Sequence, residues 1–159
     1  MPSAALRPAI LGGVDGVITS FTIVAGASAG ALSTRAVVVV GTSSLLADGV
    51  SMGVSEFLSS AAATAGRSTD GALSPARLGL VCFSSFVFFG ALPLAAYLAL
   101  MDSLAASAAS ALAALAILGV ARARIADESV PKGIVQTVTL GSAAGLVAYA
   151  VGVLAASYA

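Results

Sequence analysis

The sequence predicts an all-α, polytopic membrane protein, because its composition is too apolar for a water-soluble domain and its apolar residues form five long runs. Hydrophobic residues make up 59% of the 159 positions and charged residues 9%, whereas a soluble domain carries roughly 25% charged residues. The net charge is zero, so the basic surface that nucleic-acid binding requires is not expected. We therefore expect the lipid bilayer, and no nucleic acid, as a partner.

Five runs can be interpreted as membrane-spanning helices, since a helix needs ~20 residues to cross the hydrocarbon core. They cover about 9–31, 36–62, 78–100, 103–121 and 133–157, and the fourth is marginal in length. The first run is too long for the apolar part of a cleaved signal peptide, so we interpret it as the first span. The connections are short, which predicts a single five-helix transmembrane domain over residues 1–159.

The basic residues separate to one side of this five-span plan. The N-terminus and the connections after spans 2 and 4 share that side and carry Arg7, Arg67, Arg77, Arg122, Arg124 and Lys132, whereas the other side carries only Arg35. Cytoplasmic loops are enriched in Lys and Arg, so we expect a cytoplasmic N-terminus and a C-terminus on the far side. A bacterial inner membrane and a vacuole-type organelle membrane both fit this plan.

Acidic residues lie inside two of the apolar runs. Asp48 and Glu56 occur in LLADGVSMGVSEFLS (45–59), and Asp15 occurs in GGVDGVITSFTIVAG (12–26). At ~100° per residue, Asp48 and Met52 share one helical face with Ser55 and Ser59. A charge at the bilayer centre costs at least ~2.5–3.5 kcal/mol on insertion scales, so intramembrane acids predict an ion or proton pathway.

Asp15, Asp48, Met52 and Glu56 form the predicted metal site. The chain has no histidine and one cysteine, Cys82, so the ligands must be carboxylate, hydroxyl, carbonyl or thioether groups. Thioether sulfur favours Fe²⁺ or another first-row metal over Mg²⁺ and Ca²⁺. Counted from the ends of the runs, Asp15 and Glu56 lie at similar depth, with Met52 and Asp48 successively deeper. Carboxylates that bind either metal or protons would allow metal/proton exchange.

Other interpretations of these residues stay open. Asp15 can act as a hydrogen-bonded acid at a helix end, and Asp48 as an interhelical hydrogen-bond partner. Glu56 can be solvated at the interface, and Met52 is more often a gap-filler than a ligand. At the level of function, the alternatives are a non-transporting membrane metal-binding or sensor protein and a pathway for protons or another cation. No nucleophile–base pair or cofactor motif is visible, so neither an enzyme nor a bound cofactor is expected.

Glycine pairs spaced four residues apart recur along the chain. They are Gly12/Gly16, Gly26/Gly30, Gly49/Gly53 and Gly141/Gly145. Such pairs let helices approach closely in lipid. Because there are more of these seams than a few spans need among themselves, we expect a homo-oligomer.

The two acidic segments resemble the vacuolar iron transporter family. Residues 12–26 fit the pattern G-x-x-D-G-x-x-T-x-F-x-x-V-A-G, and residues 47–59 fit A-D-x-x-S-M-G-x-x-E-[YF]-L-S. The resemblance implies a homodimer of five-helix subunits that exports Fe²⁺, and often Mn²⁺, from the cytosol in exchange for protons. It also implies a path at the dimer interface lined by Asp15, Met52, Glu56 and Asp48.

A mechanism and one departure follow from this resemblance. By alternating access, metal would displace protons from Asp15 and Glu56 and then pass Met52 and Asp48, and the carboxylates would regain protons from the far side. Full-length members carry a Glu-rich cytoplasmic metal-binding domain between spans 2 and 3. Here that connection is about fifteen residues long and holds one acid, Asp70, so the chain resembles the short, nodulin-like members.

Overall fold

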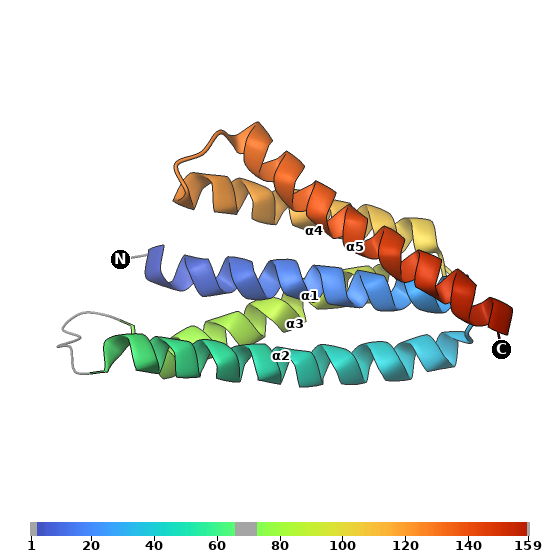
Figure 1. Cartoon of the computed structure of the whole chain (residues 1–159), viewed down its shortest axis with the longest axis horizontal. Coiled ribbons are helices and arrows are strands. Elements are labelled where there is room, and N and C mark those ends of the chain that lie inside the picture. Colours follow the sequence, from blue (N-terminus) through green and yellow to red (C-terminus); the bar gives the residue numbers. More distant parts are fainter. Residues whose placement is uncertain (1–2, 66–72, 159) are drawn as a thin grey trace.

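Five helices run back and forth along one axis in the computed structural model, which describes residues 3–65 and 73–158 (Figure 1). They are α1 (Ser3–Ala29), α2 (Thr34–Thr64), α3 (Pro75–Ala99), α4 (Leu104–Ile125) and α5 (Val130–Tyr158). Each of the five is long and apolar enough to cross a membrane, and the described residues contain no strand. The predicted all-α, five-span class is therefore confirmed.

The helices extend beyond several of the predicted apolar runs because polar residues continue them toward the membrane surface. α1 begins six residues earlier than predicted, and α4 continues through Arg122 and Arg124 in its last turn. Cations near a helix C-terminus interact favourably with the helix dipole, which explains why the marginal fourth run becomes a helix of 22 residues.

The helix starts follow ordinary capping rules. α2 and α4 begin after Ser33 and Ser103, whose side chains accept hydrogen bonds from Ala36 N (3.3 Å) and Ala106 N (3.2 Å). Each serine thus satisfies one of the backbone donors that a helix start leaves free. A proline in the first turn starts α3, where its missing N–H leaves no helical hydrogen bond unmade.

Three helices end in left-handed turns formed by residues other than glycine. Ala31 follows α1 with φ 53°, Met101 and Asp102 follow α3 with φ 55° and 62°, and Asp127 follows α4 with φ 52°. The turn after α1 is closed by a hydrogen bond from Leu32 N to the Ala27 carbonyl (2.9 Å). These turns reverse the chain within a few residues, so the two helices that each turn joins run antiparallel to each other.

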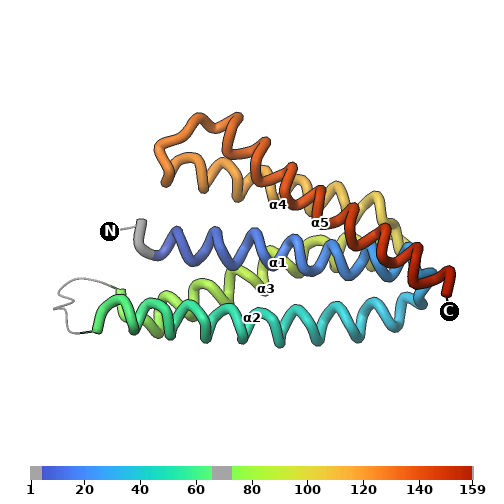
Figure 2. Tube along the Cα trace, in the orientation of Figure 1, coloured from blue at the N-terminus to red at the C-terminus, as the bar shows by residue number. Residues whose placement is uncertain are grey.

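Helix α1 is the central element of the bundle. It contacts each of the other four helices, whereas α2 contacts only α1 and α3, and α5 contacts only α1 and α4. Figure 2 shows α2 on one side of α1, with α4 and α5 on the other. Two buried clusters hold α1 in place, one around Val17 with Leu115 and Leu118, the other around Val24 with Leu94 and Tyr97.

The glycine pairs are all used inside the subunit. A Cβ added at Gly12 or Gly16 would overlap the carbonyl oxygen of Cys82 or Phe86 on α3. The other pairs pack Gly26 and Gly30 on α5, Gly49 and Gly53 on α3, and Gly141 and Gly145 on the side chains of Leu115 and Phe21. Packing within one chain thus accounts for all four pairs, so they do not by themselves indicate an oligomer.

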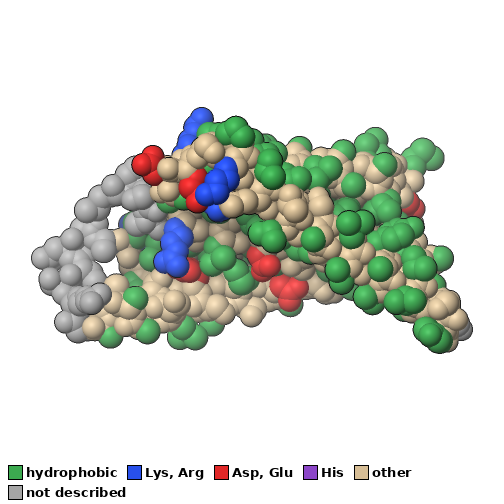
Figure 3. Space-filling view, turned by 45° about the horizontal axis from the view of Figure 1, so that its top comes forward, with side chains coloured by type: hydrophobic (Ala, Val, Ile, Leu, Met, Phe, Trp, Pro, Cys, Tyr) green, Lys and Arg blue, Asp and Glu red, His purple; other side chains and the backbone are tan. Residues whose placement is uncertain are grey.

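The described basic residues gather at one end of the bundle, as the five-span plan predicts. Arg7, Arg77, Arg122, Arg124 and Lys132 lie near the end that carries the N-terminus and the α4–α5 connection, and Arg35 lies at the start of α2, at the opposite end (Figures 1 and 3). Arg67 and Asp70 fall outside the described residues. At the basic end, the Arg122 guanidinium forms an ion pair with Glu128 Oε2 at 3.3 Å and donates a hydrogen bond to Gln136 Oε1 at 2.7 Å.

Candidate metal site

Helix α2 is attached to the bundle along one narrow stripe. Its buried residues are Val37, Gly41, Leu45, Gly49 and Gly53. Because these residues recur every four positions, they form one face, and the glycines among them let α3 approach closely. At Gly53, an added Cβ would lie only 3.0 Å from the Gly79 carbonyl oxygen of α3. The rest of the α2 surface is left to face outward.

The polar face of α2 is exposed in the single subunit. Asp48, Ser51, Ser55 and Ser59 are all exposed, and Met52 is partly buried beside them. We call these five residues the α2 polar face. The apolar side chains on the other flank of the helix, including Val50 and Val54, are also about half exposed, at 54% and 50%. Both flanks of α2 therefore lack a covering helix within the described residues.

Asp15 lies at the level of Asp48. A Cβ added at Gly90 of α3 would lie against both Leu45 and Gly16, so Leu45 of α2 and Gly16 of α1 sit side by side across α3. Asp15 is partly buried, and Asp48, one turn beyond Leu45 on the neighbouring helix, is exposed. Two neighbouring carboxylates repel each other, and a cation or a proton held between them relieves that repulsion.

Glu56 lies closer to the basic end than Asp15 does, so the expected depth match between these two residues is wrong. Gly53, one turn from Glu56, packs on Gly79 near the start of α3, while Gly16, next to Asp15, packs on Phe86. The prediction failed because α1 begins six residues earlier than its apolar run. At ~1.5 Å per residue, this places Asp15 about 9 Å further from the helix start than expected.

Glu56 has a hydrogen-bond partner that the sequence reasoning missed. The Ser60 hydroxyl donates to Glu56 Oε1 at 2.8 Å, and both side chains are partly buried. Residues four apart lie on the same helical face, so the spacing alone could have identified Ser60. This bond orients the carboxylate near the end of α2 where the basic residues gather.

The four predicted ligands form a series rather than a closed cage. Within the part of the chain that the structure describes, no three acidic or cysteine side chains lie close enough together to hold a metal ion. Asp15 and Asp48 lie at the same level of the bundle, next to Gly16 and near Leu45, which both approach Gly90. Met52 and Glu56 follow at one-turn intervals along α2, ~6 Å apart. Figure 3 shows acidic side chains near the middle of the bundle as well as beside the basic residues at its left end. A row of separate, incomplete sites suits an ion that must bind and then leave.

The sequence of the whole chain was compared with models of known protein families. The model of the VIT family matches residues 6–70 and 62–153, nearly the whole chain. The chain belongs to the VIT family. This confirms the resemblance found in the motifs of the first two helices. The two matched segments overlap over residues 62–70, between α2 and α3.

Curated relatives are similar over a shorter stretch. A protein named vacuolar iron transporter from Toxoplasma gondii is 46% identical over 57 residues, which is 36% of this chain and 19% of the relative. Proteins of the same name from Plasmodium falciparum and Plasmodium berghei are 40% identical over 57 residues, 36% of this chain and 21% of each relative. The chain thus matches only about a fifth of the length of these relatives. Together with five helices long and apolar enough to span a bilayer, the family places the chain among multi-pass membrane proteins.

Proposed function

We propose that the protein transports a divalent transition metal, Fe²⁺ or Mn²⁺, across its membrane. The observation that carries this proposal is the exposed α2 polar face, which presents Asp48 and three serines midway along a membrane-spanning helix. Intramembrane charge is costly against lipid, so this face favours a water-containing path. The vacuolar iron transporters among the relatives support iron as the cargo, and membership of their family favours transport over catalysis.

A second copy of the chain would complete the path. Asp15 is only partly buried, and further along α1 a groove of about 400 Å³, lined by Thr22 and Gly26, lies between α2 and α5. A two-fold symmetric dimer turns the same surface of each subunit toward the other. Such a dimer would shield both α2 polar faces from lipid and supply twice the number of carboxylate and thioether ligands. We therefore propose a homodimer that meets along α1 and α2.

The order of ligands gives the path a direction. Basic residues mark the cytoplasmic side of membrane proteins, so metal would enter at the basic end and meet Glu56 first. It would then pass the Met52 thioether, which prefers first-row transition metals to Mg²⁺ and Ca²⁺, before it reaches Asp15 and Asp48. Export from the cytosol follows, across a bacterial inner membrane or into a vacuole-type compartment.

Protons are the proposed counter-ion. Because the chain has no histidine, the intramembrane carboxylates are the groups on the proposed path that can exchange a proton for a metal ion. Metal binding at Glu56, Asp15 and Asp48 releases protons on the cytosolic side. After the metal leaves, the carboxylates regain protons from the far side, and alternating access returns the site to its starting state.

Metal flux into proteoliposomes tests this function. Fe²⁺ uptake is measured for the wild type, Asp15→Asn and Met52→Ala, with Asp127→Asn and Met101→Ala as matched controls in exposed helix connections. We expect each site variant to lose at least about tenfold in rate, equivalent to ~1.4 kcal/mol, and each control to stay near the wild-type rate.

The other outcomes separate the alternatives. Site variants as fast as the wild type would make the assignment of these residues wrong. Metal binding without flux would instead indicate a sensor or binding protein. Dissipation of a pH gradient in the complete absence of transition metal would indicate a proton pathway.

A further inference from the structure

Helices α4 and α5 diverge from one another along their length. At the basic end their backbones touch, since a Cβ added at Gly119 would lie 2.9 Å from the Gly133 carbonyl oxygen. Toward the opposite end α5 leaves α4 and packs on α1, where Gly152 fits against Gly26. The splay of the two helices opens a groove over α1, which we call the α4–α5 groove.

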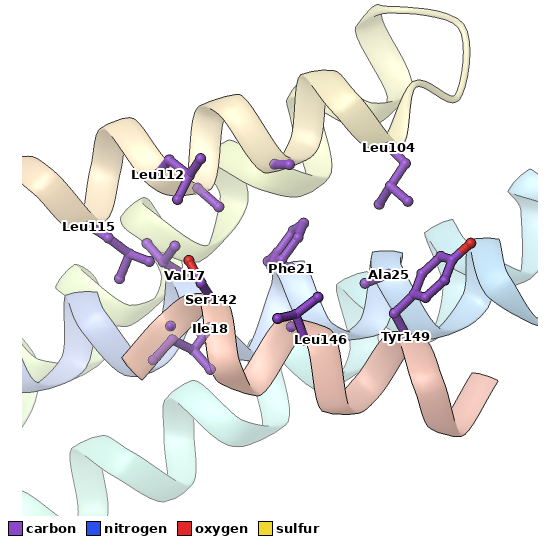
Figure 4. A pocket seen from close by; sticks show the side chains of 14 residues that line it. Val17, Ile18, Phe21, Ala25, Leu104, Leu112, Leu115, Ser142, Leu146 and Tyr149 are labelled. Carbon is purple, nitrogen blue, oxygen red and sulfur yellow. The ribbon is translucent and has the colours of Figure 1, made fainter. Parts of the chain in front are cut away.

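The α4–α5 groove is lined almost entirely by apolar residues. Its volume is about 310 Å³, and of the 14 residues that line it only Ser142 and Tyr149 carry a polar side-chain atom (Figure 4). The Tyr149 hydroxyl points toward the Leu104 end of the groove rather than into its middle (Figure 4). Phe21 and Leu115 form part of its wall, and no charged side chain lines the groove, so it does not suit a metal ion.

The rim of the groove lies on the surface that faces the hydrocarbon of the bilayer. Leu112 of α4 and Leu146 of α5 are 43% and 71% exposed at its edges, and Tyr149 is 44% exposed. A lipid tail can therefore enter sideways without crossing water. From Leu104 to Leu115 the lining extends eleven residues along α4, or ~16 Å, which gives the groove the elongated form of an alkyl chain.

We propose that the α4–α5 groove binds one acyl chain of a membrane phospholipid in each subunit. Protein interiors are close-packed, and a gap left empty here would deprive its lining of dispersion contacts. A tail from the adjacent bilayer restores those contacts with no polar group to desolvate. Tyrosine favours the membrane interface, so the headgroup would lie beyond Tyr149, at the end of the groove near Leu104.

A second copy of the chain is the less suitable occupant. The surface that needs polar cover is the α2 polar face, and α2 makes no contact with either α4 or α5. On α1 the groove is lined by Val17, Ile18, Phe21 and Ala25, while Thr22 and Gly26 line the other groove, between α2 and α5. Helix α5 thus separates the α4–α5 groove from the proposed metal path, and the lipid site holds whether or not metal is transported.

Native mass spectrometry of protein extracted from phosphatidylcholine vesicles tests the proposal. Ala108→Leu places a larger side chain in the groove, and Ala109→Leu makes the same change at the neighbouring exposed position outside it. We expect wild type and Ala109→Leu to retain one phosphatidylcholine per subunit, and Ala108→Leu to retain at least about threefold less because its side chain occupies the space of the tail. Ser142→Leu and its neighbour Ala143→Leu repeat the comparison from α5, in case one variant does not fold.

A fluorescence measurement gives an independent result. The chain contains no tryptophan, so Tyr149→Trp at the groove and Val147→Trp, at an exposed α5 position that lines neither groove, each provide a single emitter. After reconstitution with phosphatidylcholine brominated on its acyl chains and transfer into unbrominated detergent, quenching should persist for Tyr149→Trp and disappear for Val147→Trp. Equal lipid retention in the groove-filled and control variants, or equal loss of quenching, would overturn the proposal. A change in subunit stoichiometry in Ala108→Leu without a change in bound lipid would show that a second copy occupies the groove.

Discussion

The contact between Gly79 of α3 and Gly53 of α2 gives a graded prediction for how α2 is held. A Cβ added at Gly79 would lie 2.5 Å from the Gly53 carbonyl oxygen, and one added at Gly53 would lie 3.0 Å from the Gly79 carbonyl oxygen. At Gly26 the nearest atom, the Ala148 carbonyl oxygen, would be 3.3 Å away. Ordinary van der Waals contacts of a Cβ begin at 3.4 Å, so alanine requires shifts of about 0.9, 0.4 and 0.1 Å at Gly79, Gly53 and Gly26.

The free energy of unfolding should follow these shifts. Overpacking costs typically about 1–3 kcal/mol, while replacing a helical glycine by alanine gains up to ~1 kcal/mol in helix propensity. We expect Gly26→Ala to be neutral or stabilising, Gly53→Ala to lose up to ~1 kcal/mol, and Gly79→Ala to lose about 2 kcal/mol. The Gly79 contact takes the upper part of the overpacking range because it requires the largest shift, and a backbone carbonyl cannot rotate away as a side chain can.

Unfolding by sodium dodecyl sulfate in mixed micelles, followed by far-ultraviolet circular dichroism, measures the three variants. The same samples should show weaker metal transport for Gly79→Ala, since a shift of α2 changes the distance between Asp48 and Asp15. If Gly79→Ala unfolds at the same detergent fraction as Gly26→Ala, the close approach of α2 and α3 does not exist and the reasoning is refuted.

Three further predictions concern residues outside this seam. Ala31→Gly should raise the free energy of unfolding by about 1 kcal/mol because Ala31 has φ 53°, which glycine adopts without the penalty of a Cβ; a lower midpoint in thermal unfolding would contradict this. Glu128→Gln should lower stability by no more than ~1 kcal/mol, since its contacts to Arg122 and Lys132 are partly exposed, and a larger loss would show a more buried network. Ser60→Ala should raise the half-saturating metal concentration for transport severalfold without abolishing transport, because Glu56 loses its orienting donor; an unchanged metal dependence would remove Ser60 from the site.

The helices and the ligand-bearing motifs could be predicted from the sequence because they depend on local properties. Twenty apolar residues define a span wherever the helix packs, and the dense motif around Met52 identified the family without tertiary information. The separation of basic residues, with Arg35 at the opposite end, likewise followed from the order of the spans alone.

The relative depth of residues on different helices could not be predicted, because it depends on how far each helix extends beyond its apolar run. Asp15 was matched to Glu56 on the assumption that both helices end with their apolar residues, and the early start of α1 at Ser3 changed the match to Asp48. The partners of the glycine pairs were equally hidden. Spacing shows that Gly12 and Gly16 share a face, but only the fold shows that α3, rather than another subunit, covers it.

The proposed function requires that the α2 polar face line an aqueous metal path while the opposite flank of α2 faces lipid. Cys82 is fully buried, so a cysteine introduced on the α2 surface can be followed against little background reaction. Ser55→Cys and Val54→Cys compare adjacent positions on the two flanks, reacted with a charged, membrane-impermeant thiol reagent in proteoliposomes with and without Mn²⁺. We expect rapid reaction of Ser55→Cys that Mn²⁺ slows, and little reaction of Val54→Cys. Equal reactivity at the two positions, or a rate at Ser55→Cys that Mn²⁺ leaves unchanged, would contradict it.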